Sequence, residues 1–221
     1  MKLFQLLSLA LLTTSILCCQ TNGKKQNISN NDTHDSEIVP KEALQSKSQK
    51  DVFGSFVDPR DNRTYKTIKI GGVEWFAENL AYESSESVCF NDTCGKYGRM
   101  YSKNVLSNIA PSGWRVATDD DWKKVEILFG MDSASVHKTG LSRGELPELT
   151  KGLSIILAGT ISSINNKPHF SNEGKITSYW CPIDNGLYFR TIFSHGAIMR
   201  KEESTYPSKI KKYVRCVRNI Q

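Results

Sequence analysis

Six cysteines have the most varied chemistry in this chain, because a cysteine can carry a lipid, form a disulfide or bind a metal. Two of them are adjacent near the N-terminus, and four are spread over the rest of the chain: Cys18 and Cys19, then Cys89, Cys94, Cys181 and Cys216. The chemistry open to each depends on the compartment, and the N-terminal residues predict the compartment.

Residues 1–18 have the features of a bacterial lipoprotein signal peptide. Lys2 gives a positive start, and the apolar stretch from Leu3 to Leu17 is too short to span a bilayer. Cys19 follows the small residue Cys18, which suits the processing peptidase, so we predict that Cys19 is lipidated. Its acyl chains would anchor the protein to the membrane of the cell envelope. The alternative is an ordinary secretory signal in which these cysteines have no role.

The segment after the signal, residues 19–50, is rich in Asn, Ser, Lys and Gln and has no aromatic residue. It cannot bury enough apolar surface to offset the entropy of ordering, which predicts a flexible tether. The remaining residues, 51–221, are enough for one domain. The net charge of +6 is modest, and export argues against a nucleic-acid partner.

An even number of cysteines in an exported domain indicates disulfides. Cys89 and Cys94 enclose four residues of turn-like composition, so a local bridge between them is geometrically easy. Cys181 and Cys216 then form the second pair, which joins two predicted strands. The other two pairings of four cysteines remain as alternatives.

Other residues with catalytic or metal-binding chemistry are sparse. The histidines, His34, His137, His169 and His195, lack metal-ligand spacing. Asp119–Asp121 follow Thr118 in a capping-box pattern, and the run lacks the glycine and distal glutamate of a calcium loop. There is neither a phosphate-binding loop nor a dinucleotide fingerprint. We therefore predict no catalytic residue, no metal and no cofactor, and hence no enzyme.

The predicted elements define an α+β fold. A hairpin is predicted by three neighbouring features: a strand-like alternation of side chains in Tyr65–Ile70, a Gly71-Gly72 turn and a return strand at Val73–Phe76. A helix begins after Thr118 and stops at Gly130, with an apolar stripe of Trp122, Val125, Leu128 and Phe129. Further predictions are a short helix in 101–108, a mostly irregular 131–150, and strands at 153–158, 177–181, 187–193 and 212–218, with turns at 165–168 and 184–186. Alternating basic residues in the last strand predict a solvated face, with a phosphate-binding patch as the alternative.

Five motifs in a fixed order carry a resemblance to a known family. They are FVDPRDNRTYKTIKIGGVEWFAENL (56–80), YGRMY (97–101), GWRVATDDDW (113–122), YW (179–180) and VRCVR (214–218). The chain resembles the Fibrobacter succinogenes major paralogous domain family, a surface and secreted module of bacteria. The resemblance implies a C-type lectin-like domain, with two short helices packed on a small twisted, mainly antiparallel sheet and with long loops.

The resemblance also bears on particular residues. The tryptophans in these motifs, Trp75, Trp114, Trp122 and Trp180, are predicted to be core residues. Glu78 and Asn79 are expected to hydrogen-bond to turn backbones, with ligand contact as the alternative. Family members commonly have a cysteine where Ala110 stands, which implies that Cys216 has changed partner. Formylglycine-generating enzymes have a related fold and bind copper through two cysteines, and Cys89 and Cys94 could imitate that site.

These observations favour a non-enzymatic, lipid-anchored envelope protein that binds a glycan, a polymer or a protein partner. Such a binder should have an aromatic-rimmed concavity among the loops after Leu141. The alternatives are a purely structural envelope lipoprotein and a copper oxidase. The ligand-binding residues are not predictable from the sequence.

Overall fold

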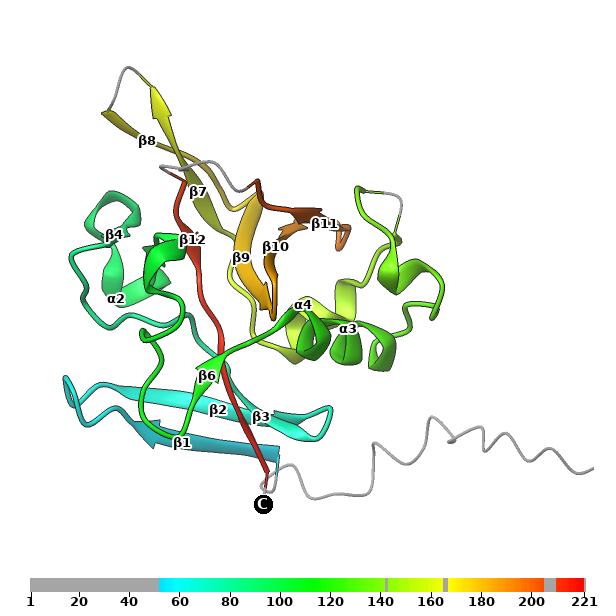
Figure 1. The fold of residues 1–221 in the computed structure, drawn as a ribbon, viewed down its shortest axis with the longest axis horizontal. Coiled ribbons are helices and arrows are strands. Elements are labelled where there is room, and N and C mark those ends of the chain that lie inside the picture. Colours follow the sequence, from blue (N-terminus) through cyan, green and yellow to red (C-terminus); the bar gives the residue numbers. More distant parts are fainter. Residues whose placement is uncertain (1–51, 142, 165–166, 205–209, 221) are drawn as a thin grey trace, which may run out of the picture. The chain divides into compact units, whose positions relative to one another are not determined.

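The computed structural model describes residues 52–141, 143–164, 167–204 and 210–220. Within them the fold is α+β, with two β-sheets and a few short helices (Figure 1). The predicted signal peptide, Cys19, the tether, His34 and the turn residues 165–166 lie outside the described residues. No helix in the described ranges is long and apolar enough to cross a membrane.

A five-stranded sheet is built around the predicted hairpin. Its strands, in spatial order, are β1 (Phe53–Val57), β2 (Thr64–Ile70), β3 (Val73–Phe76), β13 (Cys216–Asn219) and β6 (Arg115–Val116). The pairing of Ile70 with Val73 places Gly71 and Gly72 in the turn, where both have a positive φ that favours glycine. The hairpin prediction is confirmed.

The second sheet has eight strands. Six of them follow the order β11 (Ile198–Glu202), β10 (Gly186–Phe193), β9 (Ile176–Ile183), β12 (Lys212–Tyr213), β5 (Arg99–Tyr101) and β4 (Ser87–Cys89). The other two, β7 (Ala158–Ile164) and β8 (Lys167–Glu173), form a hairpin attached to β9. The two sheets replace the single small sheet expected from the family resemblance.

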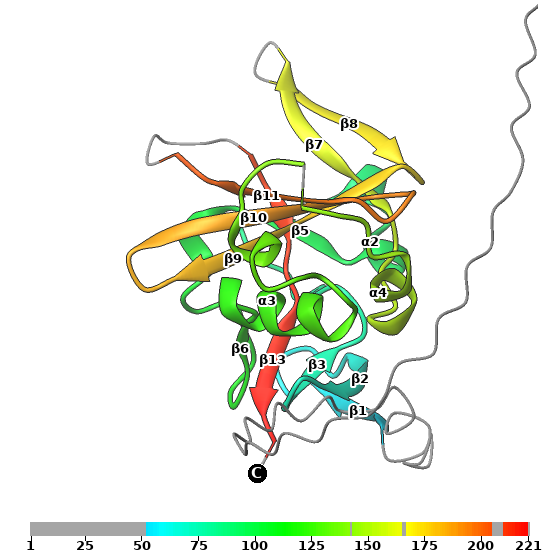
Figure 2. The same ribbon diagram turned by 90° about the vertical axis from the view of Figure 1, so that its right-hand side faces the viewer.

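The main helix, α3 (Asp119–Leu128), lies between the two sheets (Figure 2). The predicted capping box is confirmed, because the Thr118 side chain accepts from the Asp121 backbone and the Asp121 side chain accepts from the Thr118 backbone. Trp122 and Val125 are buried, but Leu128 is exposed, so the apolar stripe is narrower than predicted.

The remaining helices are short. They are α2 (Cys94–Tyr97), α4 (Pro147–Gly152) and the 3-10 turns Phe90–Asp92, Lys103–Val105 and Ser135–His137. The predicted helix in 101–108 is therefore only one 3-10 turn. The predicted strand at 153–158 is displaced, because β7 begins only at Ala158, the last residue of that apolar run. Strands β9 and β10 and the turn between them are confirmed.

Residues 212–218 differ most from the prediction. They form two strands that belong to different sheets, since β12 pairs with β5 and β9 while β13 pairs with β3 and β6. Residues 212–217 are all buried, so the expected solvated basic face is wrong. A short strand that crosses from one sheet to another has neighbours on every side, and alternation alone does not reveal them.

The core consists of two apolar clusters. One surrounds α3 and includes Trp75 and Trp122, whose rings meet edge to face at a centroid distance of 5.3 Å. The other includes Trp114 and Trp180 and lies on the opposite face of the five-stranded sheet. All four tryptophans are buried, which confirms the prediction that they are core residues.

Candidate functional site: an arginine hub, a groove and a small pocket

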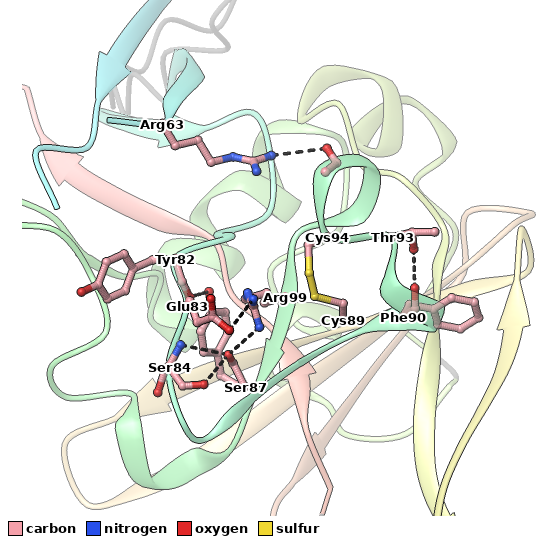
Figure 3. Close-up of a disulfide and its surroundings, with 12 residues drawn as sticks. Arg63, Tyr82, Glu83, Ser84, Ser87, Cys89, Phe90, Thr93, Cys94 and Arg99 are labelled. Atoms are coloured by element: carbon pink, nitrogen blue, oxygen red, sulfur yellow. Dashed lines mark hydrogen bonds and ion pairs between the residues drawn. A yellow bond between two sulfur atoms is a disulfide. The ribbon is translucent and has the colours of Figure 1, made fainter. Parts of the chain in front are cut away.

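Cys89 and Cys94 form a disulfide at the start of α2, as predicted (Figure 3). Their Cα atoms are 5.0 Å apart, within the usual range for a disulfide. The bridge closes the turn that contains Phe90, whose carbonyl accepts a hydrogen bond from the Thr93 hydroxyl (Figure 3). In the disulfide form neither sulfur is a thiolate, so the pair does not provide the copper ligands of the enzyme alternative.

The predicted Cys181–Cys216 disulfide is wrong, because both cysteines are free and fully buried. Cys181 lies on β9 in one sheet and one apolar cluster, whereas Cys216 lies on β13 in the other sheet and the other cluster. Burial raises the pKa of the Cys181 thiol to about 11, and it also raises the pKa of Cys216. Both are therefore inert thiols that act as small core residues.

The histidines in the described part of the chain do not converge. His137, His169 and His195 are exposed and come from separate elements. Within the described ranges there is no group of three or more His, Cys, Asp or Glu side chains placed to hold a metal ion.

The three aspartates at the start of α3 have three different environments. Asp121 completes the capping box and binds Arg115, with Arg115 Nη2 at 2.9 Å from Asp121 Oδ1. Asp120 is exposed, whereas Asp119 is fully buried and is bound by Arg190 and Arg200. The sequence predicted the cap but missed this ion network, because the arginines come from strands 71 and 81 positions away.

The network under α3 pairs each buried carboxylate with buried guanidinium groups. Arg190 Nη1 is 2.7 Å from Asp119 Oδ1, and Arg190 Nε is 2.7 Å from Glu126 Oε1. Glu126 also binds Arg143, and Asp119 also binds Arg200. Burial would raise the pKa of Asp119, but the hydrogen bond from Arg200 and the charge of Arg190 dominate and hold it well below its usual value. The network therefore fastens α3 to β10 and β11.

Another buried arginine, Arg215, lies outside this network, at the junction between β12 and β13. Its Nε donates to Asn79 Oδ1 at 3.0 Å, and Asn79 Oδ1 also accepts from the Tyr179 hydroxyl. The other nitrogens of Arg215 donate to backbone carbonyls, those of Phe76, Leu153 and Ser154. Asn79 Nδ2 donates to the Tyr97 carbonyl at 2.9 Å, so it bonds to backbone as expected, but at the end of α2 rather than in a turn. We call Asn79, Tyr97, Tyr179 and Arg215 the arginine hub.

The arginine hub collects four of the five sequence motifs in one place. Asn79 belongs to the first motif, Tyr97 to the second, Tyr179 to the fourth and Arg215 to the fifth. Sequence reasoning considered Asn79 but placed Arg215 on a solvated strand face. The available signal was the position of Arg215 between two apolar residues, Val214 and Cys216, inside a family motif.

An open groove of about 950 Å³ lies at one end of the five-stranded sheet. Its lining residues are Phe53, Gly54, Ser55, Lys69, Glu74, Gly113, Trp114, Arg115, Val217, Arg218, Asn219 and Ile220. The Arg218 guanidinium lies 4.6 Å from the centroid of the Trp114 ring, and Arg218 Nε is 2.7 Å from Glu74 Oε2. We call this feature the sheet groove. It is an aromatic-rimmed concavity, but it lies away from the loops after Leu141, where we expected one.

A small pocket of about 70 Å³ lies beside the arginine hub. Its lining residues are Arg63, Glu78, Asn79, Gly95, Lys96, Tyr97, Gly98, Ser154, Ile156 and Arg215. Arg63 Nη2 donates to the Gly95 carbonyl at 3.4 Å (Figure 3). We call this feature the hub pocket.

These features define an α+β domain with one short disulfide, a polar hub made of its motif residues, and two concave surfaces that carry positive side chains. The family model of the Fibrobacter succinogenes major domain matches residues 68–218, more than half of the chain, and the chain therefore belongs to this family. The hub residues Asn79, Tyr97, Tyr179 and Arg215 all lie within the matched range. A search of curated proteins and a search of solved structures each found no match to the chain.

Proposed function

We propose that this chain is a non-enzymatic, lipid-anchored protein of the bacterial cell envelope that binds an acidic glycan through the sheet groove. The single observation that carries the proposal is the sheet groove itself, in which the Arg218 guanidinium over the Trp114 ring lies beside the further positive side chains of Lys69 and Arg115. The finer fold assignment, a C-type lectin-like domain, is part of the same proposal and rests on the family resemblance and the α+β architecture.

The floor of the groove favours an extended ligand. Register places Lys69, Glu74 and Arg218 on one face of three adjacent strands, because Lys69 pairs with Glu74 and Glu74 pairs with Arg218. Gly54 lines the groove without a side chain, and a Cβ atom at this position would lie 2.8 Å from Thr67 Oγ1. The glycine therefore leaves this part of the groove open. A polymer can therefore lie along the sheet and contact several side chains at once.

The charges of the groove favour a ligand that carries carboxylates. Lys69 has no ion-pair partner among the described residues, and the Arg218 side chain is 41% exposed beyond its contact with Glu74. The Nε and Nη2 atoms of Arg218 contact Glu74, which leaves the donors of Nη1 for a ligand carboxylate, and the guanidinium lies over the Trp114 ring. Aromatic rings and arginines are also the side chains that contribute most energy at binding surfaces.

The test compares two lysines of the same strand. Lys69 lines the groove, whereas the exposed Lys66 points to the opposite face of β2 and is absent from the lining. Detergent-solubilised full-length protein is titrated with polygalacturonate and with neutral dextran. We expect binding of polygalacturonate alone, with affinity that falls as salt rises. Lys69→Gln and Arg218→Gln should each weaken it several-fold, while Lys66→Gln should not.

Three results would contradict the proposal. Equal effects of Lys66→Gln and Lys69→Gln would mean non-specific attraction to a basic protein. Binding of dextran alone would mean that the groove charges have no part. No binding of any polymer, by protein that melts cooperatively, would leave the purely structural lipoprotein as the better account.

The anchor is tested separately, because it rests on residues outside the described part of the chain. We expect Cys19→Ser to move the protein from the membrane fraction to the soluble exported fraction. Membrane partitioning that is unchanged in Cys19→Ser, without labelled palmitate in the wild type, would contradict the lipid anchor.

A further inference from the structure

The hub pocket has the properties of a binding site that is separate from the sheet groove. Its volume of about 70 Å³ is several times the space that one water molecule requires. Its lining comes from distant segments of the chain, and three of them contribute the motif residues Asn79, Tyr97 and Arg215. The motif residues therefore build the wall of a cavity as well as the hub behind it.

Two arginines of this pocket have hydrogen-bond donors left over. The Nε atom of Arg63 is buried and has no hydrogen-bond partner, and its Nη2 makes one long contact to Gly95. A guanidinium has five N–H donors, and the contacts of Arg215 occupy four of them. Buried donors without acceptors are costly, and a bound acceptor removes that cost.

The charge of the pocket points to an anion. Its lining holds the cations Arg63, Lys96 and Arg215 and one carboxylate, Glu78. The Lys96 ammonium lies 3.8 Å from Glu173, so that pair balances itself at the rim. The two arginines then outnumber Glu78, and the interior keeps an excess positive charge.

From the cavity, its spare guanidinium donors and its charge, we infer that the hub pocket binds a small oxyanion, either a carboxylate or a phosphate group. The unpartnered Nε donor of Arg63 and the one remaining Nη2 donor of Arg215 can each donate to an oxygen of either group. Ser154 also lines the pocket. Its backbone has a positive φ of 48°, and its carbonyl accepts a hydrogen bond from Arg215 Nη2. This bond fixes the guanidinium in one orientation at the pocket wall.

The experiment titrates full-length protein in detergent with inorganic phosphate and, separately, with acetate. Ionic strength is kept constant with sodium chloride, and binding is followed by calorimetry and by the shift in melting temperature. Saturable binding of phosphate, of acetate or of both supports the inference, and the stronger ligand identifies the headgroup. The absence of saturable binding with both would overturn it.

Two variants that should change the oxyanion affinity in opposite directions make the test specific. Arg63→Gln removes a donor fork and should weaken binding about tenfold or more, since hydrogen bonds to charged groups are strong. Glu78→Gln removes the opposing carboxylate and should strengthen binding. If the pocket had only a structural role, the two variants would not change the oxyanion affinity in opposite directions. If both variants leave the affinity unchanged, the oxyanion binds elsewhere and the inference is wrong.

Lys66→Gln is the matched control, because this exposed lysine on β2 is three positions from Arg63 in sequence but does not line the pocket. It should change neither phosphate nor acetate binding. The sheet groove is checked in parallel with polygalacturonate. Arg63→Gln should leave polygalacturonate binding intact, whereas Lys69→Gln should leave phosphate binding intact. Failure of one site therefore leaves the other testable.

Discussion

Arg190 and Arg215 are both buried in the core, yet the protein compensates their charges in different ways. Arg190 is fully buried and binds the carboxylates of Asp119 and Glu126. Arg215 is 2% exposed, and its hydrogen bonds go to neutral oxygens, those of Asn79 and of three backbone carbonyls. No carboxylate of the described residues lies within ion-pair distance of Arg215.

This difference separates an arginine that holds the fold together from one that also leaves charge available. Arg190 contacts two carboxylates, those of Asp119 and Glu126, although it shares them with Arg200 and Arg143. Around Arg215 the dipoles of amides satisfy hydrogen bonds without cancelling the charge. The hub pocket opens beside Arg215, where a ligand can bring the missing negative charge.

The largest expected effect comes from Glu126, which holds both Arg190 and Arg143 and is fully buried. Glu126→Gln keeps the shape of the side chain but removes its charge, so the two guanidinium groups lose a shared counter-ion. We expect a loss of about 3–5 kcal/mol in the free energy of unfolding, the usual result of breaking a buried ion pair. Urea denaturation followed by circular dichroism measures it.

The control for this variant is Glu148→Gln, which removes a carboxylate from an exposed ion pair with Lys151. An exposed pair contributes at most about 1 kcal/mol, so this variant should melt like the wild type. A Glu126→Gln protein as stable as Glu148→Gln would show that the network under α3 is dispensable.

Lys212 extends the comparison to a buried cation whose ammonium lies over aromatic rings. Its ammonium lies 3.9 Å from the centroid of the Phe189 ring and 4.9 Å from that of Trp180. Burial lowers the pKa of Lys212 to about 8, and the nearby charge of Glu203 only partly opposes this shift. The fold therefore disfavours the charged amine relative to the unfolded chain, where its pKa is about 10.4.

This shift predicts a dependence of stability on pH. Between about pH 8 and 10.4 the unfolded chain binds the proton and the folded protein does not, so the Lys212 contribution to stability should rise with pH in that window. The rise should be clearest below about pH 9, because above it the raised pKa values of the Cys181 and Cys216 thiols oppose it. Lys212→Met should raise stability at pH 7 by about 1–3 kcal/mol and flatten the rise, because Met still packs against the rings. Thermal melts from pH 7 to 10.5 measure both effects, and a rise that persists in the variant would contradict the assignment.

The sequence predicted the features of this fold that depend on neighbours along the chain. The Gly71-Gly72 hairpin and the capping box of Thr118 and Asp121 are both local signals, and both are confirmed. The Cys89–Cys94 bridge is of the same kind, since its ends are five positions apart.

The features that it missed depend on long-range partners. Arg215 meets Asn79 across 136 positions, and Arg200 meets Asp119 across 81. Alternation of basic and apolar residues in 212–218 describes a strand but not its neighbours, so the crossing between sheets was invisible. The same gap produced the wrong Cys181–Cys216 pairing, because the number of cysteines says nothing of which sheet each occupies.

Asn79→Asp should have the smallest effect on stability. It is also the most direct test of the difference between Arg190 and Arg215. The new carboxylate keeps the acceptor for Arg215 and Tyr179 but loses the donor to the Tyr97 carbonyl. The ion pair gained with Arg215 offsets part of this loss, so we expect a net change of about 1 kcal/mol. Arg215 would then resemble Arg190, and phosphate affinity should fall at least tenfold.

Asn79→Ala separates charge from packing in this test. It removes the same donor but adds no negative charge, so it should destabilise the protein more, by about 2–3 kcal/mol, and yet retain more phosphate binding than Asn79→Asp. Calorimetric titration of both variants below their melting temperatures gives the comparison. If Asn79→Asp binds phosphate as tightly as the wild type, the uncompensated charge of Arg215 does not attract the anion, and Arg63 must hold it alone.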